Sequence, residues 1–186
     1  MKTIRLFKVF LLLFIFSVSA NATTDANDKG ETKKQTTETT AMTSCADFVS
    51  ANTPIVLPDT GAVTTEDVIS VPNEISIEDM TVTITIQHTW NNDLDINLVS
   101  PSGTSILIMD GDTCAGNEDD IDVILNDIFP IATCSPGTVP AISGSVAPSQ
   151  PLAGFNGENT IGDWTLVMDD AFNGDGGFLN VWEMQN

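Results

Sequence analysis

Three short segments of the chain bring carboxylate and amide side chains together around turn-forming residues. The longest, Asp169–Gly176, reads Asp-Asp-Ala-Phe-Asn-Gly-Asp-Gly, and the second, Asn91–Asp95, reads Asn-Asn-Asp-Leu-Asp. Ca²⁺ binds oxygen ligands of this kind, about six to eight of them, from side chains, backbone carbonyls and water. We therefore expect a calcium site, with the candidate ligands Asp93, Asp95, Asp169, Asp170, Asn173 and Asp175.

The third segment is an acidic loop that combines Asp110 and Asp112 with Glu118, Asp119, Asp120 and Asp122. The longest segment is not an EF-hand loop, because Ala171 occupies its third position. Asp, Asn and Gly also favour turns for purely local reasons. For each of the three segments, a solvated turn therefore stays open as the alternative to a metal site.

The charge of the chain limits its partners. All six Lys and Arg residues lie at or before Lys34, whereas most of the 26 acidic residues follow it, and the formal net charge is −20. Nucleic acid is excluded as a partner because its affinity comes from Lys and Arg contacts to phosphate. Anionic membrane surfaces are excluded for the same reason. Each later carboxylate has to be solvated, protonated, hydrogen-bonded or neutralised by a cation.

Catalytic patterns are weak in this sequence. His88 is the only histidine, so any Ser–His–Asp triad would have to use it. Its place on the apolar side of a predicted strand favours a hydrogen-bonded packing residue instead. A hydrolase with paired carboxylates, such as Asp93 with Asp95, is a further alternative. Stacking aromatics usually line such clefts, and Trp90 is the only tryptophan that does not lie in a strand pattern.

The N-terminus has the pattern of an export signal. Residues 1–22 combine a basic start, an apolar run from Val9 to Phe16 and small residues at the cleavage position. Residues 23–44 are rich in Thr, Lys, Asp and Glu, which predicts a flexible tether. The remainder, 45–186, has the length of one domain. We expect a secreted, periplasmic or extracellular protein without a membrane-inserted segment.

Three cysteines in an exported chain predict one disulfide and one further thiol. Cys114 and Cys134 bracket an acidic insertion, so their pairing is the one we expect. Pairings that involve Cys45 stay open.

The elements that position these residues read as strands. Met80–Thr89 alternates strictly between apolar and polar residues, and 94–98, 164–169 and 179–185 repeat the pattern. Ile106–Met109 is apolar on both sides and predicts a central strand. Turn formers such as Pro101-Ser102-Gly103 separate these runs. The sequence therefore predicts an all-β fold, an antiparallel sandwich or jelly roll.

Three blocks of residues, in this order, resemble the P domain (P/Homo B domain) of proprotein convertases. The first is His88-Thr89-Trp90 followed by Asp93–Thr104, which matches the family pattern H-T-[YW]-x-G-D-L-x-I-x-L-x-S-P-x-G-T. The second is Pro151-Leu152, Phe155–Glu158 and Gly162–Leu166, and the third is Asp169, Gly174–Leu179 and Trp182. Asn52–Ile55 with Pro58-Asp59 resembles the opening strand of the family.

The resemblance implies a jelly-roll β-sandwich of the galactose-binding-like type. The chain departs from the family pattern at Asn92, where glycine is usual, and in the insertion between Cys114 and Cys134. Leu179 and Trp182 are three apart, so we expect a bulge or turn boundary between them.

In proprotein convertases this module accompanies a subtilisin-like catalytic domain, to which serine endopeptidase activity belongs. We expect here a stand-alone, non-catalytic module, stabilised by calcium, that binds a protein partner such as an exported protease. The alternative is a calcium-dependent adhesion or glycan-binding module, with Trp90 as the residue that stacks on the ligand.

Overall fold

The alternating segments of the sequence form strands in the computed structural model, which describes residues 47–186. The four predicted from alternation are β4 (Thr81–His88), β5 (Leu94–Val99), β9 (Gly162–Asp170) and β10 (Gly177–Gln185). The predicted export signal at 1–22, the tether at 23–44 and Cys45 lie outside the described residues. The described part of the chain is all-β, as expected.

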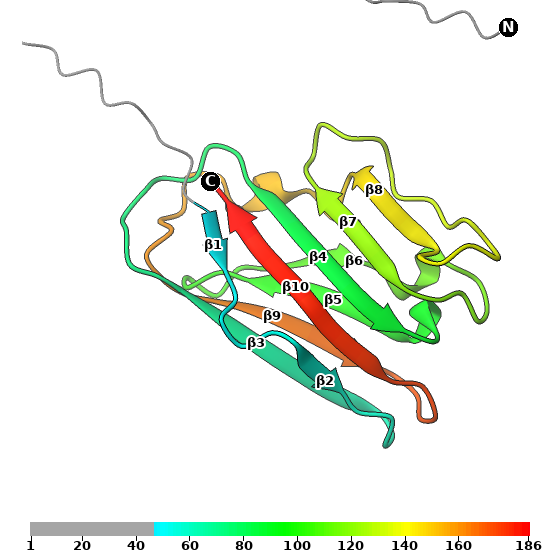
Figure 1. The fold of residues 1–186 in the computed structure, drawn as a ribbon. Helices are drawn as coiled ribbons and strands as arrows, with labels where there is room; N and C mark the ends of the chain where they lie inside the picture. The colour runs from blue at the N-terminus through cyan, green and yellow to red at the C-terminus, as the bar shows by residue number, and fades with distance from the viewer. Residues whose placement is uncertain (1–46) are drawn as a thin grey trace, which may run out of the picture. The chain divides into compact units, whose positions relative to one another are not determined.

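The strands form two sheets (Figure 1). The first sheet has the order β1-β10-β4-β7-β8, and β2 also pairs with β10. The second sheet has the order β3-β9-β5-β6. Three 3₁₀ helices lie in the connections. The remaining elements are β1 (Asp47–Val49), β2 (Ile55–Leu57), β3 (Val63–Val71), β6 (Ser105–Met109), β7 (Ile121–Leu125), β8 (Ile142–Val146), η1 (Asn91–Asp93), η2 (Gly111–Thr113) and η3 (Leu152–Phe155).

The apolar side chains of both sheets form one core. Val82, Ile84 and Ile86 of β4 are fully buried, and they alternate with partly exposed threonines. Trp164 of β9 and Trp182 of β10 are the largest buried side chains, as their place in strand patterns predicted. The Trp164 ring packs edge-on against Phe155 of η3, with ring centroids 5.1 Å apart. Such a pair adds about 0.5–1.5 kcal/mol beyond the burial of its surface.

β6 is an edge strand, so the prediction of a central strand at Ile106–Met109 was wrong. The segment is largely buried although it lies at the edge of the sheet, because other parts of the chain cover it. The backbone N–H groups of Ser149 and Gln150 donate to the carbonyls of Ile108 and Leu107. Gly154 of η3 lies so close to Ile106 that an added Cβ would approach the isoleucine side chain to 2.8 Å.

One strand pair departs from the predicted antiparallel arrangement. β7 and β8 run parallel, with Ile121 opposite Ile142 and Leu125 opposite Val146. Residues 126–141 connect them, and parallel neighbours require a crossover of this length. The Cys114–Cys134 disulfide, which the structure confirms, joins this crossover to the segment after β6. The jelly-roll connectivity stays a prediction.

The expected irregularity in the last strand is also present. The pairing of β10 with β4 shifts register between Leu179 and Val181. This bulge lets Leu179 and Trp182 both face the core, where both are fully buried.

The carboxylate of Asp67 joins the two sheets. Asp67 of β3 is 5 % exposed, and it accepts hydrogen bonds from Trp182 Nε1 at 2.6 Å and Asn52 Nδ2 at 2.7 Å. The Ser50 hydroxyl donates to the same carboxylate. Burial by itself raises the pKa of Asp67, but the bonds from Ser50, Trp182 and Asn52 outweigh it, so the net pKa is lowered. The ionised form therefore stabilises the fold.

We predict that Asp67→Asn lowers the free energy of unfolding at pH 7 by about 2–3 kcal/mol. The substitution leaves a buried donor facing the indole and hydroxyl donors, and buried groups without partners carry costs of this size. The measurement is urea unfolding followed by tryptophan fluorescence. The matched control is Asp163→Asn. Asp163 is an exposed carboxylate of β9 that accepts a hydrogen bond from Ser70 of β3, the strand that carries Asp67. The expected effect is below about 0.5 kcal/mol.

The same carboxylate predicts a loss of stability in acid. Because the pKa of Asp67 is lowered in the folded state, its contribution is complete above the ordinary value of 3.8 and is lost as pH falls through the folded value. The stability of the wild-type chain should therefore fall more steeply below pH 4 than that of Asp67→Asn. Parallel acid titrations of the two chains would contradict this assignment.

Candidate functional site

Two loops meet at one end of the described domain. β5 pairs with β9 so that Leu94 lies opposite Asp170, and β10 pairs with β4 so that Gly177 lies opposite His88. The segment after β4 and the segment after β9 are therefore neighbours. The backbone N–H of Ala171 donates to the carbonyl of Asp93 at 2.9 Å and joins them directly.

Glycine is required where the second loop returns to the sheet. A Cβ on Gly177 would lie 1.7 Å from the carbonyl oxygen of Gln87, well inside any tolerated contact. Gly174, with φ of 97°, supplies the left-handed residue of the turn before it. The glycine-rich stretch that suggested a cation loop therefore has a packing role as well.

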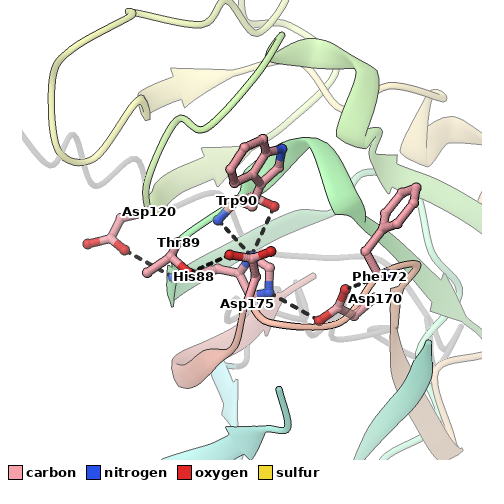
Figure 2. Close-up of polar contacts among 7 residues, drawn as sticks. All are labelled: His88, Thr89, Trp90, Asp120, Asp170, Phe172 and Asp175. Carbon is pink, nitrogen blue, oxygen red and sulfur yellow. Dashed lines mark hydrogen bonds and ion pairs between the residues drawn. The ribbon is translucent and has the colours of Figure 1, made fainter. Parts of the chain in front are cut away.

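His88 holds the two loops in place from beneath. Its Nε2 lies 3.3 Å from Oδ2 of Asp170, and both side chains are almost completely buried. Its Nδ1 lies 3.0 Å from the carbonyl oxygen of Trp90 (Figure 2). The backbone N–H of His88 donates to Asp120 at 3.0 Å. His88 is thus a hydrogen-bonded packing residue, as predicted, and within residues 47–186 neither ring nitrogen contacts a serine or cysteine.

An open pocket of about 370 Å³ lies between the two loops. Figure 2 shows the rings of Trp90 and Phe172 projecting beyond the carboxylates of Asp170 and Asp175. Trp90 is 36 % exposed and Phe172 is 61 % exposed. Thr89 donates to the Asp175 carboxylate at 3.2 Å, which orients it. The lining residues, called the loop pocket below, are Trp90, Asn92, Asp93, Phe172, Asn173 and Asp175.

Asp93 is the more buried of the two carboxylates that line the loop pocket. The residue is only 9 % exposed, and its carboxylate accepts no hydrogen bond from any residue in the described part of the chain. Burial raises its pKa first, and the nearby carboxylates of Asp175 and Asp170 raise it further against the opposing effect of His88. The pocket therefore contains a carboxylate that no donor of the described residues bonds and that reaches solvent through the pocket.

The predicted calcium ligands fall into two groups. Asp93, Asn173 and Asp175 line the loop pocket, and Asp170 lies behind it, bonded to His88. Asp95 and Asp169 are elsewhere. They lie opposite each other on the outer face of the second sheet, away from the core. Asp95 accepts the N–H of Gly111 at 2.9 Å, and Asp169 accepts the hydroxyl of Thr64 at 2.5 Å.

Three carboxylates of the third acidic segment, Asp110, Glu118 and Asp120, accept backbone N–H groups. Asp110 caps η2 by accepting the N–H of Asp112, and Glu118 accepts that of Gly137 at 2.8 Å. Within residues 47–186, no three Asp, Glu, His or Cys side chains gather in an arrangement able to hold a metal ion by themselves. A calcium ion would therefore have to complete its coordination with amide, carbonyl or water oxygens.

Trp90 is the one predicted ligand-binding residue that lines the pocket, and Phe172 is the one that sequence reasoning missed. The signal was present in the longest acidic segment, where Phe172 is the single large apolar residue among carboxylates, amides and glycines. A phenylalanine in such a loop either packs inward or marks a contact surface, and this one is exposed. Asn92 lay in the second predicted segment but was not among the candidate ligands, and it also lines the pocket.

The family model of the proprotein convertase P-domain matches residues 77–186. The chain belongs to the P-domain family. This match includes both loops of the pocket, whereas the residues before 77, which also resembled the family, lie outside the matched range. A comparison with curated proteins gave no match.

Two solved structures are similar to the P-domain chain. They are the serine protease of Aeromonas sobria and the complex of that protease with its chaperone, at 15 % and 14 % sequence identity and a TM-score of 0.46 each. Each alignment covers 76 % of this chain and 26 % of the other, so the chain spans about a quarter of the protein it matches.

We predict that Asp93→Asn stabilises the P domain at neutral pH. A raised pKa means that the folded state binds the proton more tightly than the unfolded state. Stability therefore declines as pH rises from the ordinary value of 3.8 through the folded value. Removing the charge removes this decline, so the melting temperature at pH 7 should rise by a few degrees.

The control for Asp93→Asn is Asp112→Asn, which removes the same charge from an exposed position. It should change the melting temperature by less than Asp93→Asn does. A lower melting temperature for Asp93→Asn would mean that the carboxylate is stabilised in the folded state after all.

Proposed function

We propose that this chain is an exported, non-catalytic P-domain module that binds and stabilises a protein partner, such as a subtilisin-like protease. Membership of the P-domain family carries this proposal, because the family is an accessory module of such proteases. His88 contacts the Trp90 carbonyl and Asp170 rather than a nucleophile. Within the described residues no helix is long and apolar enough to cross a membrane.

Calcium is the proposed stabilising ion. Residues 47–186 contain no Lys or Arg, so no basic side chain among them competes with a divalent cation for the carboxylates. Asp95 and Asp169 are direct neighbours across two strands, an arrangement of like charges that destabilises a sheet unless a cation screens it. The proposed site is this pair on the outer face of the second sheet, with water completing the coordination.

We predict that millimolar calcium raises the melting temperature of the purified chain by several degrees over chelator. A ligand at a hundred times its dissociation constant adds about 2.7 kcal/mol. Sodium chloride of matched ionic strength should give a smaller rise, because it only screens charge. Asp95→Asn should abolish the calcium-specific part. Equal rises in calcium and sodium would overturn the calcium site.

We predict that the immobilised chain captures a protease-like protein from the secretome of its native source. The elution fractions are analysed by mass spectrometry, with a column of heat-denatured chain as the control. Recovery of polysaccharide alone would contradict the partner and favour the glycan-binding function that exposed Trp90 and Phe172 also suit.

A further inference from the structure

The loop pocket combines two kinds of wall. Trp90 and Phe172 present exposed aromatic surface, while Asp93 and Asp175 present carboxylates, and Asn92 and Asn173 add amides. The volume of about 370 Å³ accommodates a side chain or a small molecule rather than a bare ion. Its position at the end of the sandwich leaves it open to another molecule.

The loop pocket lacks a hydrogen-bond donor for the carboxylate of Asp93. It is nine-tenths buried, it lines the pocket, and its carboxylate accepts no hydrogen bond within residues 47–186. The nearest group able to carry positive charge is His88, which is already engaged with Asp170. Among residues 47–186 the fully buried side-chain polar atom without a partner is Asn91 Oδ1, so the Asp93 oxygens still reach solvent through the pocket. A cationic donor that enters the pocket can contact them, and it gains more at this partly desolvated carboxylate than at a fully solvated one.

The aromatic walls decide which cation fits. Ca²⁺ takes about six to eight oxygen ligands, whereas two of the six residues that line the pocket, Trp90 and Phe172, have no side-chain oxygen. A guanidinium group instead stacks on aromatic faces while it donates to carboxylates. A neutral sugar would also stack on the rings, but it would leave the negative charge of Asp93 and Asp175 without compensation.

We propose that the loop pocket binds the guanidinium group of an arginine side chain presented by the protein partner. This inference rests on the proposed function, since it assumes a protein partner. The cation stacks between Trp90 and Phe172 and donates to Asp93 and Asp175. The described residues of the chain contain no arginine or lysine, so within them the pocket has no occupant of its own.

The probe is N-acetyl-arginine amide, and its matched control is N-acetyl-citrulline amide, which has the same length and shape without the charge. Both are titrated into the ¹⁵N-labelled chain while the indole and backbone amide signals are recorded by NMR. We expect saturable shifts at the Trp90 indole with a Kd of about 1–10 mM for the arginine probe. The citrulline probe should bind at least about tenfold more weakly.

Variants assign the binding to the pocket. Asp93→Asn should weaken the arginine probe at least about tenfold, and Trp90→Ala should do the same through the stacking surface. Asp93→Asn is expected to melt at a higher temperature than the wild type, so a loss of binding is not a loss of fold. Asp112→Asn, which removes the same charge from an exposed position outside the pocket, should bind as the wild type does.

Several results would overturn the proposal. They are equal binding of the two probes, arginine binding that survives Asp93→Asn, and no saturable shift at all. A further chain with Lys29, Lys33 and Lys34 replaced by Gln tests the basic residues nearest the domain in sequence. If only that chain binds the probe, the pocket is filled by its own lysines and the partner arginine is wrong.

The capture experiment separates this inference from the proposed function. If wild type and Asp93→Asn capture the same partner equally well, the module binds a protein but the arginine pocket is wrong. If neither captures a protein while the arginine probe binds wild type alone, the pocket is selective and the proposed function fails.

Discussion

The hydrogen bonds to the Asp67 carboxylate are the interaction on which the sandwich depends most. They draw donors from the β10 strand of one sheet and from the segment between β1 and β2, and they meet at β3 of the other sheet. In most proteins a lysine or arginine would accompany such a buried carboxylate. Residues 47–186 contain neither, so an indole, an amide, a hydroxyl and the backbone N–H of Val68 provide the compensation.

Because lysine and arginine are lacking, other carboxylates also accept hydrogen bonds from neutral donors. Glu158 accepts the hydroxyls of Ser102 and Thr104, which fixes the Pro-Ser-Gly turn after β5. Asp127 accepts two backbone N–H groups at the start of η3, at 2.8 Å each. Neutral donors thus bond many of the carboxylates in residues 47–186. Among the buried ones, Asp67, Asp93 and Asp170, Asp93 is the carboxylate that accepts no hydrogen bond, and it lines the pocket with the two exposed aromatic rings.

Much of the fold was predictable because apolar and polar residues alternate along a strand that has one buried face. β4, β5 and β9 carry core-facing apolar residues at alternate positions, as predicted, and β10 does so apart from the one-residue shift at its bulge. β3 was missed because Asp67 occupies an inward position, where the pattern calls for an apolar residue. β6 was misplaced because burial on both sides does not reveal whether a strand or a loop provides the cover.

The candidate site was half predictable for a related reason. Asp169 and Asp170 are adjacent in one strand, so they had to point to opposite faces, and grouping them as joint ligands ignored this rule. Asp93 and Asp175 come together only because β4 pairs with β10 and β5 with β9, a long-range register that no local pattern contains. The Cys114–Cys134 pairing, by contrast, followed from its local context and is confirmed.

The lack of lysine and arginine after Lys34 has a further consequence for the covalent chain. A protease that cleaves after lysine or arginine finds no peptide bond to attack from residue 35 to the C-terminus. This resistance belongs to the covalent chain, so it persists when the domain opens or unfolds. The domain is therefore protected from such proteases by its composition as well as by its fold.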